Sequence, residues 1–269
     1  MKRGIKRLYD RVSVARRAAG EFMIHLDGRP LKTPKRDTLL LPTEPLAFGI
    51  ALEWEMQGTM IRPDTMPLMK LATTTIDQVA EIRPTMTDSM LRHLRSDMVC
   101  FRSLDEPKLM AREERHFAPL LDWLKHDLEI ELATSTDLTL RHPPFSMARA
   151  EILLDEADDW EISALDFSTN ACKSFAIALA LCRNQIGAEE ALTAARVAEQ
   201  YQIDEWGEAR LIEKYNVIFV KCQRVNNMNQ PEPFYSASLR QVEAGHDLDA
   251  ADLAVRLSAA STFMRMLRC

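Results

Sequence analysis

The sequence predicts an α+β fold in which a small β-rich N-terminal domain is followed by a larger all-helical C-terminal domain. Apolar and polar residues alternate in the first part of the chain, as in Phe22–Leu26, which is typical of a half-buried strand. From Thr85 onward, apolar residues recur at helical spacing almost throughout. Pro84 interrupts the pattern between the two parts, so we predict domains at 1–83 and 84–269.

Turn-forming residues separate the elements of the first domain. Asp27 and Gly28 follow the alternating run and form a common hairpin signal. Leu39–Leu41 predicts another short strand. A helix is predicted to begin near Glu44, because a proline in the first turn is well tolerated there. This helix carries Trp54 on its apolar face, which favours a structural role for the indole.

The second domain contains one segment with no polar face. Phe175–Cys182 is apolar nearly all round, which predicts a helix buried at the centre of the domain. We expect it to form part of a longer helix, and the apolar spacing predicts helices at 68–79, 87–99, 113–128, 149–155, 163–186 and 188–207.

Composition excludes several classes of function. The net charge of −6 and the pI of about 5.6 argue against general nucleic-acid binding. The longest apolar run is far shorter than the ~20 residues of a membrane span, so no membrane insertion is expected. The five cysteines include no CxxC pair, which favours reduced thiols over a disulfide framework. The eight glycines are isolated, whereas nucleotide-binding loops need clusters of them.

The first residues of the chain are basic. Residues 1–17 contain many Lys and Arg and a single acidic residue, Asp10. This pattern is typical of a remnant of a mitochondrial targeting segment, and also of a solvated start to the first strand. Both interpretations remain open.

Motifs for catalysis or metal binding are absent from the sequence. No HExxH, GxSxG or phosphate-loop pattern occurs, and no histidine has zinc-site spacing with a cysteine, so neither cofactor nor metal is predicted. One enzymatic alternative remains, in which Glu243, His246 and Asp247 act as an acid–base set on a small molecule.

A polar stripe near residue 200 is a candidate contact surface. Its members are spaced over less than three helical turns: Glu199, Gln202, Glu205, Trp206 and Glu208. The carboxylates can meet basic or backbone-donor groups of a partner. Alternatively, the stripe is a solvated helix face with the indole of Trp206 turned inward.

Five motifs occur in a characteristic order along the chain. They are LDGRPLKTP (26–34), ALEWEMQG (51–58), MPLMKLATTTIDQV (66–79), EQYQIDEWGE (199–208) and VEAGHDLDAADL (242–253). Together they resemble the family of assembly chaperones that hold the alpha subunit of the F-type ATP synthase before its catalytic head is built. The combination of the first two motifs is the specific one.

The resemblance implies a non-enzymatic protein of the mitochondrial matrix that binds the unassembled alpha subunit as a monomer and prevents its aggregation until the beta subunit joins it. Trp54 and Trp206 are expected to support the binding surface. The residues expected to contact the partner are Glu199, Gln202, Glu205, Glu208, Glu243 and Asp247.

The segment 209–241 departs from the family pattern. In the family, the WG and VExxHD pieces are adjacent, whereas here this segment separates them. It is either a genuine surface insertion, which costs little loop-closure entropy, or a translated intron or gene-model error. If it is genuine, Glu243, His246 and Asp247 need not lie beside Glu199.

Overall fold

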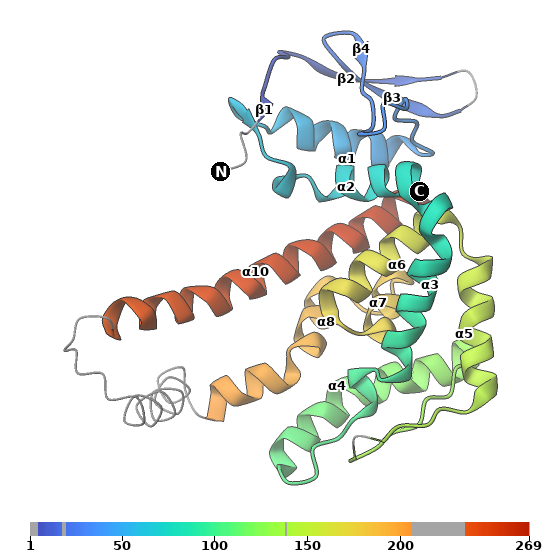
Figure 1. Ribbon diagram of the computed structural model, residues 1–269, viewed down its shortest axis with the longest axis vertical. Helices are drawn as coiled ribbons and strands as arrows, with labels where there is room; N and C mark the ends of the chain where they lie inside the picture. Colours follow the sequence, from blue (N-terminus) through green and yellow to red (C-terminus); the bar gives the residue numbers. More distant parts are fainter. Residues whose placement is uncertain (1–4, 18–19, 138, 206–234, 269) are drawn as a thin grey trace, which may run out of the picture.

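The chain folds as a small antiparallel sheet and two helices that lie over a helical body (Figure 1). The computed structural model describes residues 5–17, 20–137, 139–205 and 235–268, with only the backbone for 235–248. The predicted order, a small β region followed by a mostly helical remainder, is confirmed.

The strands are β1 (Ile5–Lys6), β2 (Val12–Arg16), β3 (Phe22–Leu26), β4 (Arg29–Pro30) and β5 (Met60–Ile61). The long helices are α1 (Glu44–Glu55), α2 (Pro67–Thr74), α3 (Ala80–Arg95), α4 (Pro107–Leu128), α5 (Pro144–Glu156), α6 (Asp159–Cys172), α7 (Phe175–Cys182), α8 (Ala188–Ala195) and α10 (Tyr235–Arg268).

The main sheet has the antiparallel order β2-β3-β4, and β1 pairs separately with β5. Asp27 and Gly28 both have positive φ, 49° and 78°, so the predicted hairpin turn between β3 and β4 is confirmed. The strand predicted at Leu39–Leu41 does not form, and only an isolated bridge joins Leu41 to Phe22. Leu41 is fully buried at that bridge, because the chain turns at once into α1 beneath the sheet.

The start of α1 is fastened to the end of α10. Thr43 is the N-cap residue of α1, but its hydroxyl donates to the carbonyl oxygen of Met266, at 2.7 Å, instead of capping the helix. The two helices cross closely at Gly49, where an added Cβ would lie 2.9 Å from the sulfur of Met266. Helices α1 and α2, which lie beneath the sheet, therefore pack against the C-terminal end of α10 (Figure 1).

Pro84 does not end a helix, so that expectation is wrong. The backbone runs from α2 through a π-helical turn at Thr75–Val79 into α3, and Pro84 lies inside α3. Arg83, next to Pro84 in α3, joins this helix to α5 and α6, since its guanidinium donates to Asp159 at 2.7 Å and to the carbonyl of Leu154 at 2.9 Å. Tertiary contacts thus outweigh the local preference. The division at residues 83 and 84 falls within α3, and the two-domain organisation remains a prediction.

Helix α7 lies at the centre of the core, as predicted, and all eight of its residues are buried. The single helix expected over 163–186 is two helices. Lys173 takes a left-handed conformation (φ 58°) that ends α6, and the hydroxyl of Ser174 then caps α7 by accepting from Ile177 N.

Asp97 is a buried hydrogen-bond acceptor at the N-terminus of α7. It is fully buried, and its carboxylate accepts from Ser174 Oγ at 2.6 Å and Ala176 N at 3.0 Å. Burial raises the pKa of Asp97 to about 6, although these hydrogen bonds oppose the shift.

Replacing Asp97 should destabilise the whole chain. Asp97→Ala leaves the Ser174 hydroxyl and the α7 amides buried without their acceptor, so we expect a loss of about 3 kcal/mol in the free energy of unfolding. Asp158→Ala is the matched control, because Asp158 caps α6 through Glu161 N at an exposed position and its loss should cost only about 1 kcal/mol. Urea denaturation measures both, and equal losses would contradict the anchoring role.

Candidate functional site

The helix predicted over 188–207 is interrupted at Arg196. Helix α8 ends there, and residues 197–205 form a second helical segment that docks on α4. Lys108 and Arg112 of α4 donate to Glu205 at 2.8 Å and to Asp204 at 2.5 Å. Tyr201 is buried against the same helix, and its hydroxyl donates to Glu106 at 3.0 Å. These contacts fix the orientation of the candidate stripe.

The described members of the stripe do not present one uniform acidic face. The carboxylate of Glu205 turns toward α4, whereas that of Glu199 accepts two hydrogen bonds from the guanidinium of Arg196, at 2.9 and 2.8 Å. Gln202 is exposed. Two of the three expected contact residues are therefore paired within the chain, and their role toward a partner remains a prediction.

Glu199 lines a polar cleft between the C-terminal end of α6, α8 and α10. The cleft has a volume of about 290 Å³. Its charged lining residues, which define it, are Lys173, Arg196, Glu199, Asp249, Asp252 and Arg256. Both signs of charge meet there, and Arg256 pairs with Asp252 at 2.8 Å. Such a surface suits a partner that offers hydrogen-bond donors and acceptors together.

The α10 residues of this cleft were not among the predicted contact residues. Asp249, Asp252 and Arg256 follow one another at spacings of three and four, which places them on a single helix face. This spacing was the feature of the sequence that could have indicated a shared polar face on the helix. It could not have indicated that this face lies beside Glu199.

The remaining predicted site residues lie outside the described side chains. Trp206 and Glu208 fall in the undescribed stretch 206–234, as does most of the segment 209–241. Glu243, His246 and Asp247 lie on α10 where only the backbone is described. Their convergence with Glu199 therefore remains a prediction.

The described parts of the chain offer neither a metal-binding cluster nor a membrane-spanning helix. No three His, Cys, Asp or Glu side chains described there gather in a metal-binding arrangement. Over the same residues, no helix is both long and apolar enough to cross a bilayer.

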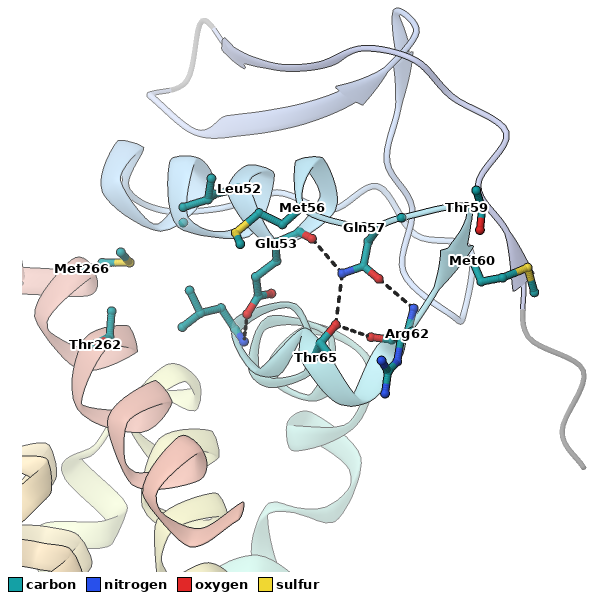
Figure 2. A pocket seen from close by; sticks show the side chains of 13 residues that line it. Leu52, Glu53, Met56, Gln57, Thr59, Met60, Arg62, Thr65, Thr262 and Met266 are labelled. Carbon is teal, nitrogen blue, oxygen red and sulfur yellow. Dashed lines mark hydrogen bonds between the residues drawn. The ribbon is translucent and has the colours of Figure 1, made fainter. Parts of the chain in front are cut away.

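A second concave surface lies between α1, α2 and the C-terminal end of α10 (Figure 2). It has a volume of about 710 Å³ and a mainly apolar lining, and we call it the apolar groove. The residues that define it are Gly49, Leu52, Glu53, Met56, Gln57, Gly58, Thr59, Met60, Arg62, Thr65, Leu68, Thr262 and Met266.

The ALEWEMQG motif builds the wall of this groove. Pro67 begins α2, and the carboxylate of Glu53 accepts from the free amides of Leu68 and Met69, each at 2.8 Å. Gln57 accepts from Arg62 N at 2.7 Å, and its amide group donates to the Glu53 carbonyl (Figure 2). The motif therefore joins α1 to α2, which the sequence analysis did not anticipate.

Trp54 packs where a structural support is expected. Its ring meets that of Tyr9 edge-on at 5.7 Å, and the hydroxyl of Tyr9 donates to the Trp54 carbonyl at 2.7 Å. These contacts fasten α1 beneath the N-terminal strands. They favour the predicted supporting role, which is still a prediction.

Comparisons with known proteins agree on one relationship. The family described as ATP12 chaperone protein matches residues 6–125. The mitochondrial protein atp12 of Schizosaccharomyces pombe is 26% identical over 201 residues, which are 70% of this chain and 69% of that protein. The crystal structure of Atp12 from Paracoccus denitrificans matches with a TM-score of 0.78 at 22% identity, over 98% of this chain and 99% of that one. The Atu1473 protein of Agrobacterium tumefaciens matches with a TM-score of 0.76 at 27% identity, over 97% and 86%.

The matched proteins are chaperones, which act through their surfaces, and these matches indicate a non-enzymatic chaperone. Over residues 6–125 the chain is similar to the ATP12 chaperone family, and its fold is that of the Atp12 crystal structure. The acid–base alternative at Glu243, His246 and Asp247 is therefore set aside.

Glu53 should make folding stability depend on pH. Burial raises the pKa of Glu53 from 4.5 to about 7, and the two amide hydrogen bonds only partly oppose this. The folded chain then holds the proton more tightly than the unfolded chain. The stability due to Glu53 is full below pH 4.5 and is lost as the pH rises through about 7. We expect the free energy of unfolding to fall by on the order of 2 kcal/mol as the pH rises through this range.

Glu53→Gln imitates the protonated side chain and should remove most of this pH dependence. The measurement is the free energy of unfolding in urea between pH 4.5 and 8. Glu55→Gln, on the exposed side of α1, is the matched control and should follow the wild-type curve. A Glu53→Gln curve parallel to that of the wild type would contradict the assignment.

Proposed function

We propose that the chain binds the free alpha subunit of the F-type ATP synthase catalytic head and prevents its aggregation until it assembles with the beta subunit. The observation that carries the proposal is the agreement with Atp12 proteins, in sequence over residues 6–125 and in fold over nearly the whole chain. The order of the five motifs supports the same assignment.

The physical basis is protection of an exposed interface. An unassembled subunit displays the apolar surface that it later buries against its neighbour, and such surfaces are large in obligate complexes. A protein that covers this surface lowers the concentration of the aggregating form by mass action. One-to-one covering needs only a monomeric chaperone.

We assign the partner contacts to Glu199, Gln202, Glu205, Glu208, Glu243 and Asp247, with Trp54 and Trp206 as supports. The polar cleft beside Glu199 favours this assignment, because its charges lie on three different helices and reach the surface together. Groups on the alpha subunit would replace part of the internal pairing of Glu199 with Arg196. This exchange limits affinity and allows release on assembly.

The compartment is proposed to be the mitochondrial matrix. The relative from S. pombe is a mitochondrial protein, which supports a mitochondrial location, and the basic residues at the start of the chain agree with it. The matrix is where the catalytic head would be built.

Co-expression tests the function directly. The chain is produced with the alpha subunit of the same source, with and without residues 209–241, and soluble one-to-one complex is quantified by size-exclusion chromatography. We expect complex with the full chain if the segment is a genuine insertion, and only with the deleted form if it is an artefact. Aggregated alpha subunit in both cases would overturn the proposal.

Charge reversal tests the contact residues. Glu199→Lys places a cation beside Arg196 and Lys173, so we expect at least a tenfold loss of complex, roughly 1.4 kcal/mol, with folding retained. Glu151→Lys reverses an exposed carboxylate on the remote helix α5 and should bind normally. Equal binding by both variants, with circular dichroism like that of the wild type, would remove Glu199 from the contact surface.

A further inference from the structure

Helix α1 exposes a stripe of large apolar side chains. Phe48, Leu52 and Met56 follow one another at a spacing of four, so they lie on one face of the helix. Their fractional exposures are 56%, 58% and 76%. Single exposed apolar residues are ordinary, but a contiguous row on one helix indicates a binding surface.

The stripe borders the apolar groove. Leu52 and Met56 line the groove from α1, and Met60 lines it from β5. Figure 2 shows Thr262 and Met266 on α10 across from them, at the other side of the groove. Met56 and Met60 on one side and Met266 on the other have flexible side chains, so the walls of the groove can adapt to the shape of an occupant.

The face of α10 that lines the groove continues along the helix beyond it. Ala251, Val255 and Ser258 precede Thr262 and Met266 at spacings of three and four, so all five share one helix face. Ala251, Val255 and Ser258 are exposed. This face is roughly 22 Å long at 1.5 Å per residue, and its small side chains permit close approach of another backbone. A helix of a partner fits this length better than a single side chain does.

The charged residues of α1 are all acidic. Glu53 lines the groove, whereas Glu44 and Glu55 lie outside its lining, and the helix has no Lys, Arg or His. The guanidinium of Arg62, at the end of the groove, already pairs with Asp64 at 3.7 Å. An occupant with Lys or Arg along its α1-facing edge is therefore favoured over one with carboxylates there.

We propose that the apolar groove binds an amphipathic helix of the client subunit, with its apolar face against Leu52, Met56 and the α10 stripe and with cationic side chains toward α1. This mode is a helix laid in a groove, with anchors at helical spacing. The assignment of the helix to the client rests on the proposed function. The polar cleft and the groove lie on different faces of α10 and so constitute two contact regions.

A synthetic helix tests the groove without the client. The probe is a fluorescein-labelled amphipathic peptide of Leu, Ala and Lys, about 18 residues long so that it is helical in solution. Fluorescence anisotropy measures its binding to the full chain. We expect binding, with at least tenfold weaker binding of the matching peptide in which Glu replaces Lys. Absence of binding, or equal binding of the two peptides, would overturn the proposal.

Substitutions on the walls of the groove test whether the Lys peptide binds there. The double variant Leu52→Gln/Met56→Gln should weaken binding of the Lys peptide at least tenfold. Val255→Gln, on the exposed face of α10 that continues from the groove, should weaken it as well. Ile152→Gln is the matched control, because Ile152 is an exposed apolar residue (47%) on α5, away from the groove. All replaced side chains are exposed, so folding should persist, and unchanged binding in the double variant would overturn the proposal.

Co-expression with the alpha subunit separates this proposal from the proposed function. If the wild-type chain and the double variant hold the subunit equally well, the groove assignment fails and the proposed function stands. If the wild type does not hold the subunit but binds the Lys peptide through the groove, the proposed function fails and the groove assignment stands. A wild-type dimer that the double variant abolishes would identify a second copy as the occupant and overturn the proposal.

Discussion

The structure depends on burying a helix that has no polar face. Helix α7 is fully enclosed, and α3, α4, α6, α8 and α10 all pack against it. An enclosed helix cannot satisfy its first amides with water, so its N-terminus needs a buried acceptor. Asp97 provides it, together with Ser174. Because α8 and α10 take their positions from α7, the polar cleft that they help to form inherits its geometry from this buried anchor.

Elements that depend on local chemistry could be predicted from the sequence. The Asp27-Gly28 turn needs positive φ at two successive residues, and few other dipeptides accept it. The start of α1 and the burial of α7 follow from proline placement and from composition alone. The α+β order of the chain followed from the same signals.

Features that depend on distant contacts could not be predicted. Helix α3 continues through Pro84, and its neighbour Arg83 bonds to α5, to α6 and to the Ala157 carbonyl between them, contacts that no local pattern predicts. The break between α6 and α7 rests on a left-handed lysine, Lys173, which propensity does not foresee. For the same reason the sequence indicated Glu199 but neither its internal partner Arg196 nor the α10 face across the cleft.

Helix α10 lines both the polar cleft and the apolar groove. Its face at Asp249, Asp252 and Arg256 lines the polar cleft, and its face at Thr262 and Met266 lines the apolar groove. We propose that a client engages both regions, because a rigid helix that fixes the distance between them raises affinity without a larger continuous interface. Apolar surface exposed in this way invites self-association, so a second copy of the chain is one of the occupants that the binding tests separate. Under the proposal made for the groove, Glu53, the carboxylate that lines it, favours a cationic occupant.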